Sequence, residues 1–300
     1  MILVVGATGL VGGMITRTLL DQGRAVRILV RHGSDYQRFV DGGAERSLGD
    51  LKDPRTLAPA LRGVDVVITT ASAGSRGGAD TAQSVDLAGN RNLIDAARAA
   101  NPTQFIFVSA LTATVDHPVP VPRAKAETEV TLRASGLPYT IVAANGIMDV
   151  MLPLVVGDRV QAGQPVTLVG DGRRRHSFVA ARDVAAFAVA AVGHPAARNQ
   201  RIAVGGPAAV SWRDIVAAYE RATGRPIDVR WIQPGQLLPD LPPGFTELVS
   251  GLLAALETFD SPVDMTQATQ TFGVPLTTLD DFVAATSRRV LTTPQADAVV

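Results

Sequence analysis

Short apolar runs alternate with amphipathic stretches along the first half of the chain. Residues 2–5 form a continuous apolar run, which is typical of a parallel strand buried on both faces. Apolar residues then recur at helical spacing from Leu10 to Leu19. Further strands are predicted at residues 25–30, 44–48, 64–69, 104–109 and 139–143, most of which are largely apolar. This alternation predicts an α/β fold with a doubly wound parallel sheet, a Rossmann fold.

Three glycines lie where the first predicted strand meets the first predicted helix. Gly6, Gly9 and Gly12 give the spacing G-x-x-G-x-x-G. Such glycines allow a tight turn, a close approach of a diphosphate to the backbone, and close packing of helix on strand. The N–H groups at the helix start then face the phosphates. A plain tight turn is the alternative. The residues predicted to bind a dinucleotide here are Gly6, Thr8, Gly9, Leu10, Val11 and Gly12.

Further cofactor contacts are expected at the carboxyl ends of the other strands, which meet in one crevice. Arg31 ends the second strand and suits a 2′-phosphate, which favours NADP (NADPH) over NAD. A solvated surface arginine is the alternative. Asp50 has the position to accept from an adenine amino group, or else it is a turn or N-cap residue. The other contacts predicted at these strand ends are Leu51, Thr70, Ala71 and Ser72.

The pattern becomes irregular after Met148. Strands at 166–169 and 176–179 are predicted about a turn at 170–172, with Asp183 capping a helix and a strand at 201–204. Further helices are predicted at residues 81–100, 123–135, 211–222, 248–256 and 279–290. We expect residues 1–146 to form the NADP-binding domain, with residues 178–205 packing back onto it. Residues 147–300 should form a smaller C-terminal α/β substrate-binding part, with a disordered tail after Thr292.

Composition narrows the possible partners. The 300 residues carry a formal net charge of zero, so we expect no nucleic-acid or anionic-membrane partner. The chain has no cysteine, and its four histidines show no metal-ligand spacing, so no metal is expected. No apolar run is long enough to span a bilayer, and no secretory signal precedes the strand at Ile2. A cytoplasmic protein, monomeric or homodimeric, is expected.

Several motifs occur in an order typical of one family. They are Gly6-Ala-Thr-Gly-x-x-Gly12, Val30-Arg31, Gly49-Asp50-Leu51, Val108-Ser109, Lys125-Ala-Glu127, Ser135-Gly-Leu-Pro-Tyr-Thr-Ile141, Asp183-Val-Ala185 and Gly273-Val-Pro-x-Thr-Thr278. On these motifs the sequence resembles the NmrA-like, atypical short-chain dehydrogenase/reductases. Members of that family are NADPH-dependent reductases of quinones, carbonyls and phenylpropanoids, or redox-sensing regulators without catalysis.

The resemblance also implies a catalytic pair that this chain keeps only in part. Standard members use Tyr-x-x-x-Lys, in which the lysine holds the nicotinamide ribose. Lys125 is present, but Val121 stands at the tyrosine position, which argues against epimerase or dehydratase chemistry. Asn145 replaces part of an Arg-Pro pair and is expected beside the nicotinamide, or else it is a turn residue. The candidate catalytic residues are Ser109, Lys125, Asn145 and His117.

The sequence therefore predicts an NADPH-dependent oxidoreductase, a ketoreductase or quinone reductase. It would transfer a hydride to a carbonyl or quinone of an apolar, aromatic, polyketide-like substrate without the usual tyrosine acid. Residues 147–156 and 237–256 would form the substrate pocket. The alternative is a non-catalytic NADP-sensing regulator of the NmrA type, which the missing tyrosine supports equally.

Overall fold

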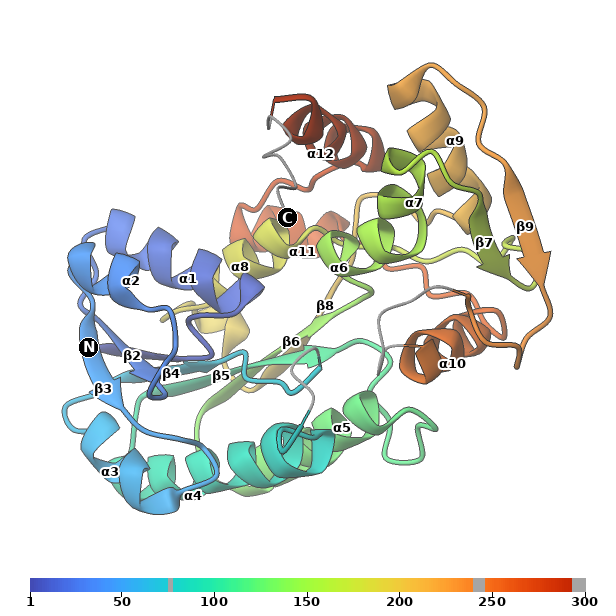
Figure 1. The fold of residues 1–300 in the computed structure, drawn as a ribbon. Helices are drawn as coiled ribbons and strands as arrows, with labels where there is room; N and C mark the ends of the chain where they lie inside the picture. Colours follow the sequence, from blue (N-terminus) through green and yellow to red (C-terminus); the bar gives the residue numbers. More distant parts are fainter. Residues whose placement is uncertain (75–77, 240–245, 293–300) are drawn as a thin grey trace, which may run out of the picture. The chain divides into compact units, whose positions relative to one another are not determined.

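A computed structural model describes residues 1–74, 78–239 and 246–292. The larger of its two units is built on a seven-stranded parallel sheet (Figure 1). The strand order is β3-β2-β1-β4-β5-β6-β8. The strands are β1 (Ile2–Val5), β2 (Val26–Val30), β3 (Glu45–Leu48), β4 (Val66–Thr69), β5 (Gln104–Ala110), β6 (Tyr139–Ala144) and β8 (Gln200–Val204). The order reverses between β1 and β4, so the predicted doubly wound Rossmann fold is confirmed.

Helices cover both faces of this sheet. In Figure 1, α1 (Leu10–Asp21), α2 (Gln37–Asp41) and α8 (Ala181–Ala190) lie on one face. The other face carries α3 (Leu57–Ala60), α4 (Asn90–Ala100) and α5 (Pro120–Ala134). The same unit contains the short helices η1 (Pro54–Thr56) and η4 (Pro195–Ala197), and also α11 (Thr266–Phe272).

Strand side chains alternate between the two faces, and both faces are buried. Leu3, Phe105 and Phe107 belong to the apolar core that includes Leu93 of α4 and Leu132 of α5. The intervening residues of the central strands are also buried: Ile2, Val4, Ile28, Ile68 and Ile106. Burial on both sides explains why these strands read as continuous apolar runs in the sequence.

The predicted helix 81–100 begins with an unusual segment. Its first part, η2 (Ala82–Gly89), is π-helical and passes directly into α4. Thr81 caps it through a reciprocal box with Ser84, in which each side chain accepts from the backbone N–H of the other residue. Such π segments often lie at functional sites.

The rest of the chain forms a second compact unit, Gly146–Ala180, Gly205–Asp264 and Leu276–Val300. Its elements are α6 (Met148–Leu152), η3 (Pro153–Gly157), α7 (Asp158–Gln161), β7 (Val166–Val169), α9 (Trp212–Thr223), β9 (Val229–Ile232), α10 (Thr246–Leu256) and α12 (Leu279–Thr292). Its core includes Phe178, Trp212 and Leu253. The first unit contains Met1–Asn145, Ala181–Val204 and Met265–Pro275. The binding role expected for each part stays a prediction.

Two local predictions for the chain after Met148 are wrong. β7 does not pair with residues 176–179 but runs parallel to β9, while His176 makes isolated bridges to Val210 and Ser261. Asp183 lies within the first turn of α8 rather than capping it, because the helix begins two residues earlier. Residues 240–245 of the expected pocket segment and the tail after Thr292 lie outside the described residues.

Two features of the described residues concern membranes and metal ions. None of the helices there is long and apolar enough to cross a bilayer. The same residues include no group of three or more His, Asp or Glu side chains that could hold a metal ion.

Candidate functional site

The glycine loop folds tightly between β1 and α1. Gly6 has a φ of +85°, and a Cβ added there would lie 2.7 Å from Oγ1 of Thr70. A Cβ on Gly12 would overlap the carbonyl oxygen of Gly6 and lie 2.6 Å from the same hydroxyl oxygen. The N–H of Gly9 donates to the Gly6 carbonyl at 2.9 Å. A side chain at either Gly6 or Gly12 would therefore force the loop away from the end of β4.

The start of α1 offers N–H donors to an anion. The helix begins at Leu10, and its N-cap, Gly9, provides no side-chain cap. No acidic residue lies in the first turn. The first N–H groups of a helix have no intrahelical acceptor, and the helix dipole adds partial positive charge there. These features fit a dinucleotide diphosphate.

A groove runs along the carboxyl ends of β1 to β4. Its lining consists of Val5, Gly6, Thr8, Leu29, Val30, Arg31, Ser34, Gly49, Asp50, Leu51, Ala71 and Val85. Six of the residues predicted to bind cofactor are thus brought together: Gly6, Thr8, Arg31, Asp50, Leu51 and Ala71. The hydroxyl of Ser72 accepts from the N–H of Gly74 at 3.3 Å and thereby shapes the loop after β4.

Asp50 and Arg31 already have partners within the protein. Oδ1 of Asp50 accepts from the N–H of Lys52 at 2.9 Å, so the turn role is present, whereas Asp53 caps η1. Nη1 of Arg31 lies 2.7 Å from the carboxylate of Asp80. Arg31 is therefore an ion-paired residue at the groove rather than an isolated surface charge.

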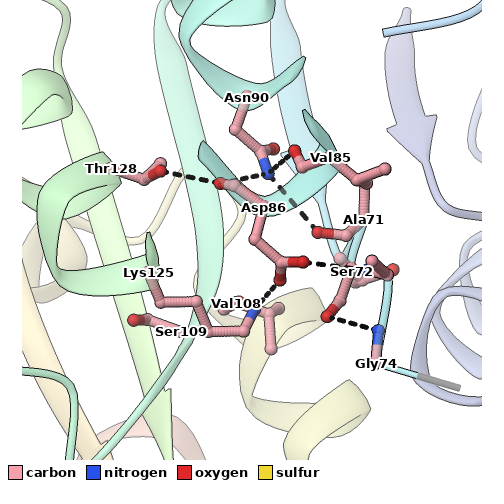
Figure 2. A network of polar contacts seen from close by, with 12 residues as sticks. Ala71, Ser72, Gly74, Val85, Asp86, Asn90, Val108, Ser109, Lys125 and Thr128 are labelled. Carbon is pink, nitrogen blue, oxygen red and sulfur yellow. Dashed lines mark hydrogen bonds and ion pairs between the residues drawn. The ribbon is translucent and has the colours of Figure 1, made fainter. Parts of the chain in front are cut away.

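Lys125 projects from α5 toward the end of β5 (Figure 2). Its Nζ donates to the carbonyl of Val108 at 3.1 Å and lies 5.2 Å from the ring centroid of Phe107. The side chain is 11% exposed. Burial lowers the pKa of Lys125, and the negative charges of Asp86 and Glu129 oppose that shift. Val121 lies one helical turn earlier on α5.

The buried carboxylate of Asp86 beside this lysine was not predicted from the sequence. Asp86 lies in η2, is fully buried, and accepts from the N–H of Ala73 at 2.9 Å through Oδ2. Oδ1 lies 3.8 Å from Nζ of Lys125 and has no hydrogen-bond partner among the described residues. As Figure 2 shows, Asp86 thus connects Lys125 with the loop after β4.

The backbone around Asp86 is held from two sides. Oγ1 of Thr128 on α5 donates to the Asp86 carbonyl at 2.8 Å. Nδ2 of Asn90 donates to the carbonyls of Asp86, Val85 and Ala71, at 3.0, 3.2 and 3.4 Å (Figure 2). In the sequence, Asp86 lies between two apolar residues, Val85 and Leu87, in a helix of which one face, with Val85 on it, is expected to be buried.

The other candidate catalytic residues are placed differently. Ser109 is buried and its hydroxyl donates to Oε1 of Glu129 at 2.6 Å. His117 is also buried, and its Nδ1 accepts from the N–H of Val119 at 3.0 Å. Asn145 is buried, with its N–H donating to Val204 at 2.8 Å. Neither Ser109 nor His117 lines the groove at the glycine loop.

The second unit has grooves of its own. One is lined by Leu154, Val155, Arg159, Gln164, Pro165, Thr167, Arg230, Leu238 and Pro239. Leu154, Val155 and Leu238 come from the segments expected to hold substrate. His176 is buried, with Nδ1 2.7 Å from Oγ of Ser261 and Nε2 3.1 Å from the Leu256 carbonyl. Burial lowers the pKa of His176, so this residue is a neutral part of the core at neutral pH.

The fold, the glycine cradle and the groove define a dinucleotide-binding protein of the Rossmann class. Comparison with known proteins agrees. The NAD(P)H-binding family matches residues 6–195. An NAD(P)H azoreductase from Xenophilus azovorans is 33% identical over 227 residues, 76% of this chain and 75% of the relative. A photosystem II assembly factor from Trieres chinensis is 30% identical over 231 residues, 77% of this chain and 72% of the relative.

A solved structure shows the same fold. The NADPH-dependent quinone oxidoreductase of Escherichia coli, complexed with NADPH, gives a TM-score of 0.82 at 22% identity, covering 96% of this chain and 100% of that one. The chain belongs to the NAD(P)H-binding family, and its expected place among the NmrA-like atypical short-chain dehydrogenase/reductases is confirmed. The expected enzyme class, an NAD(P)H-dependent oxidoreductase, is confirmed with it.

Proposed function

We propose that the protein is an NADPH-dependent reductase that transfers a hydride to a carbonyl or quinone of an apolar, aromatic substrate. The observation that carries this proposal is the position of Lys125. It holds a buried ammonium at the carboxyl end of β5, in the same unit as the glycine loop. The azoreductase relative, which by its name acts with NAD(P)H, supports a reductase.

The residues of the first unit fit the cofactor. The cradle at Gly6 and Gly12 would accept the diphosphate, and the groove past Arg31 and Asp50 would accept the adenosine part. Arg31 favours NADPH because a guanidinium pairs with a phosphate but gains little from a ribose hydroxyl. The reduced nicotinamide supplies the hydride when it is bound, and the protein orients it.

Lys125 would position the nicotinamide ribose rather than transfer a proton. Its Nζ already donates to one carbonyl, and two donor hydrogens remain for ribose hydroxyls. Val121 stands one turn away, where the family carries a tyrosine, so Lys125 has no phenol to activate. Its contribution is therefore binding and orientation.

A substrate that stabilises its own oxyanion would tolerate the missing acid. A general acid contributes roughly 10²–10⁴-fold to a rate, and aromatisation of a quinone or a neighbouring phenol offsets part of that loss. We assign Ser109 no proton transfer, because its hydroxyl donates to Glu129. Asn145 and His117 remain candidates for contacts with the nicotinamide or the substrate.

The test is oxidation of NADPH by purified protein with a panel of quinones, aromatic ketones and azo compounds. We expect turnover with at least one class, and a loss of rate together with a higher Kd for NADPH in Lys125→Met. Tight NADPH binding with no turnover on any class would refute the reductase and favour the NADP-sensing regulator.

A further inference from the structure

One carboxylate joins two cations beside the adenosine end of the groove. The oxygens of Asp80 lie 2.7 Å from Nη1 of Arg31 and 2.6 Å from Nζ of Lys52. The Asp80 side chain is 9% exposed, whereas those of Arg31 and Lys52 are 37% and 33% exposed. The hydrogen bond from Lys52, helped by Arg31, lowers the pKa of Asp80 against the cost of its burial. Asp80 is therefore ionised at neutral pH.

Local structure fixes all three charges. Arg31 follows directly after β2 and lines the groove. Lys52 projects from a turn that Asp50 closes by accepting its N–H. Asp80 directly precedes the Thr81–Ser84 capping box, and the Ser84 hydroxyl also donates to the Ala79 carbonyl at 3.2 Å. The three charged side chains thus come from three separate segments of one unit, those that follow β2 and β3 and the one that leads into η2.

We propose that Arg31 and Lys52 together bind the 2′-phosphate of NADPH, and that Asp80 is an internal anion that competes for these two cations. The inference rests on the proposed use of NADPH. A phosphate monoester carries about −1.5 to −2 charges near pH 7 and three acceptor oxygens, so it matches two cations better than one carboxylate does. The ribose hydroxyl of NADH brings no charge with which to displace Asp80.

The use of lysine at this position supports a phosphate role. The chain has 26 arginines and only two lysines, Lys52 and Lys125. Lys52 follows β3, and Lys125 on α5 reaches the end of β5 with its Nζ. An ammonium is a compact point charge that approaches a phosphate from many directions, whereas the arginine fork binds it in a plane. Arg31 and Lys52 would therefore bind different oxygens of one phosphate group.

We call Arg31 and Lys52 the phosphate clamp. Two variants test it through the Kd values of NADPH and NADH, measured by nicotinamide fluorescence. Lys52→Met should raise the Kd for NADPH about tenfold, the usual value of one charge-assisted contact, and change that for NADH less than about twofold. Asp80→Asn should lower the Kd for NADPH about three- to tenfold and leave that for NADH unchanged, because it removes the competing anion. In Lys52→Met/Asp80→Asn, the gain from Asp80→Asn should shrink, since one of the contested cations is gone.

Matched controls come from a neighbouring exposed pair, Arg38 and Asp35, whose charged atoms lie 3.8 Å apart. Arg38→Met and Asp35→Asn change the same charges and should leave the NADPH/NADH selectivity unaltered. Competition by adenosine 2′,5′-bisphosphate, compared with 5′-AMP, measures the phosphate contact without the nicotinamide. Weaker NADH binding in Asp80→Asn would overturn the inference, because Asp80 would then bind a ribose hydroxyl.

An equal effect of Lys52→Met on both cofactors would also overturn it. These readouts are binding constants, so they separate the inference from the proposed function. If the variants show the expected selectivity but the protein has no turnover, the phosphate clamp is supported and the proposed reductase function is refuted. If the protein turns over substrate but its Lys52 and Asp80 variants keep the original selectivity, only the phosphate clamp is refuted.

Discussion

Replacing Gly12 by alanine perturbs the cofactor loop at its most crowded point. The added Cβ would overlap the Gly6 carbonyl oxygen and lie 2.6 Å from Oγ1 of Thr70. Alanine gains about 0.5–1 kcal/mol over glycine in a helix interior, but overpacking of this kind costs about 1–3 kcal/mol. The start of α1 must therefore move away from β1 and β4, and the N–H groups that face the diphosphate move with it.

Gly13 provides a matched control on the same helix. A Cβ there would lie 3.3 Å from the carbonyl oxygen of Ala7 and 3.4 Å from Cζ of Phe39, which needs a shift of only a few tenths of an ångström. We expect Gly12→Ala to raise the Kd for NADPH about 10- to 100-fold, a loss of about 1.4–2.7 kcal/mol. Gly13→Ala should change the Kd less than about threefold.

The assay is fluorescence titration with NADPH, accompanied by thermal melts of both variants without cofactor. A Gly12→Ala protein that melts near the parent temperature yet binds weakly would show that the loop geometry, not global stability, sets the affinity. Equal weakening by Gly13→Ala, or parent-like binding by Gly12→Ala, would refute the close-approach argument.

Three further predictions concern buried titratable groups. Lys125→Met should raise the NADPH Kd and slow the hydride step without moving the pH–rate profile; a shifted profile with intact affinity would make Lys125 the acid. Asp86→Asn should lower the free energy of unfolding by about 1–3 kcal/mol and weaken cofactor binding, because a buried ammonium loses its nearest anion; Asp95→Asn on the exposed face of α4 is the control and should do neither. Burial raises the pKa of Tyr219 to about 12 from 10.0, so its stabilising contribution is complete below pH 10 and is lost as pH rises toward 12. Urea unfolding across this window should show the parent losing about 2–3 kcal/mol more than Tyr219→Phe, and parallel losses would contradict the shift.

The sheet and the glycine loop were predictable because their signals are local. A strand buried on both faces needs a continuous apolar run, and the φ of +85° at Gly6 needs glycine. The pairing of β7 with β9 was not predictable in this way. Val229–Ile232 contains Arg230 and Trp231 and carries no clear strand pattern, so its partner is set by the folded unit.

The site residues that lie at strand ends were predictable from the sequence. The buried charges whose partners lie far away in the sequence were not. Asp86 is buried because Lys125, 39 residues later, and the N–H of Ala73 accompany it, and neither follows from the helix sequence. Ser109 was expected at the cleft. It shares the strand face of Phe105 and Phe107, which packs against α5, and there it meets Glu129.

Glu129, the acceptor for the Ser109 hydroxyl, is paired with two arginines. Arg133 and Arg201 lie 2.8 and 3.0 Å from Oε2 of Glu129, so a buried carboxylate is compensated at the place where Ser109 donates. The alternation of β5 alone could have placed Ser109 on that face, but not the acceptor that it finds there.

The most direct test of the central claim is the rate of NADPH oxidation by the purified protein with quinone and aromatic carbonyl acceptors, compared with NADH at equal concentration. The account predicts acceptor-dependent oxidation that is faster with NADPH and that falls in Lys125→Met. Saturable NADPH binding without acceptor-dependent oxidation would contradict it.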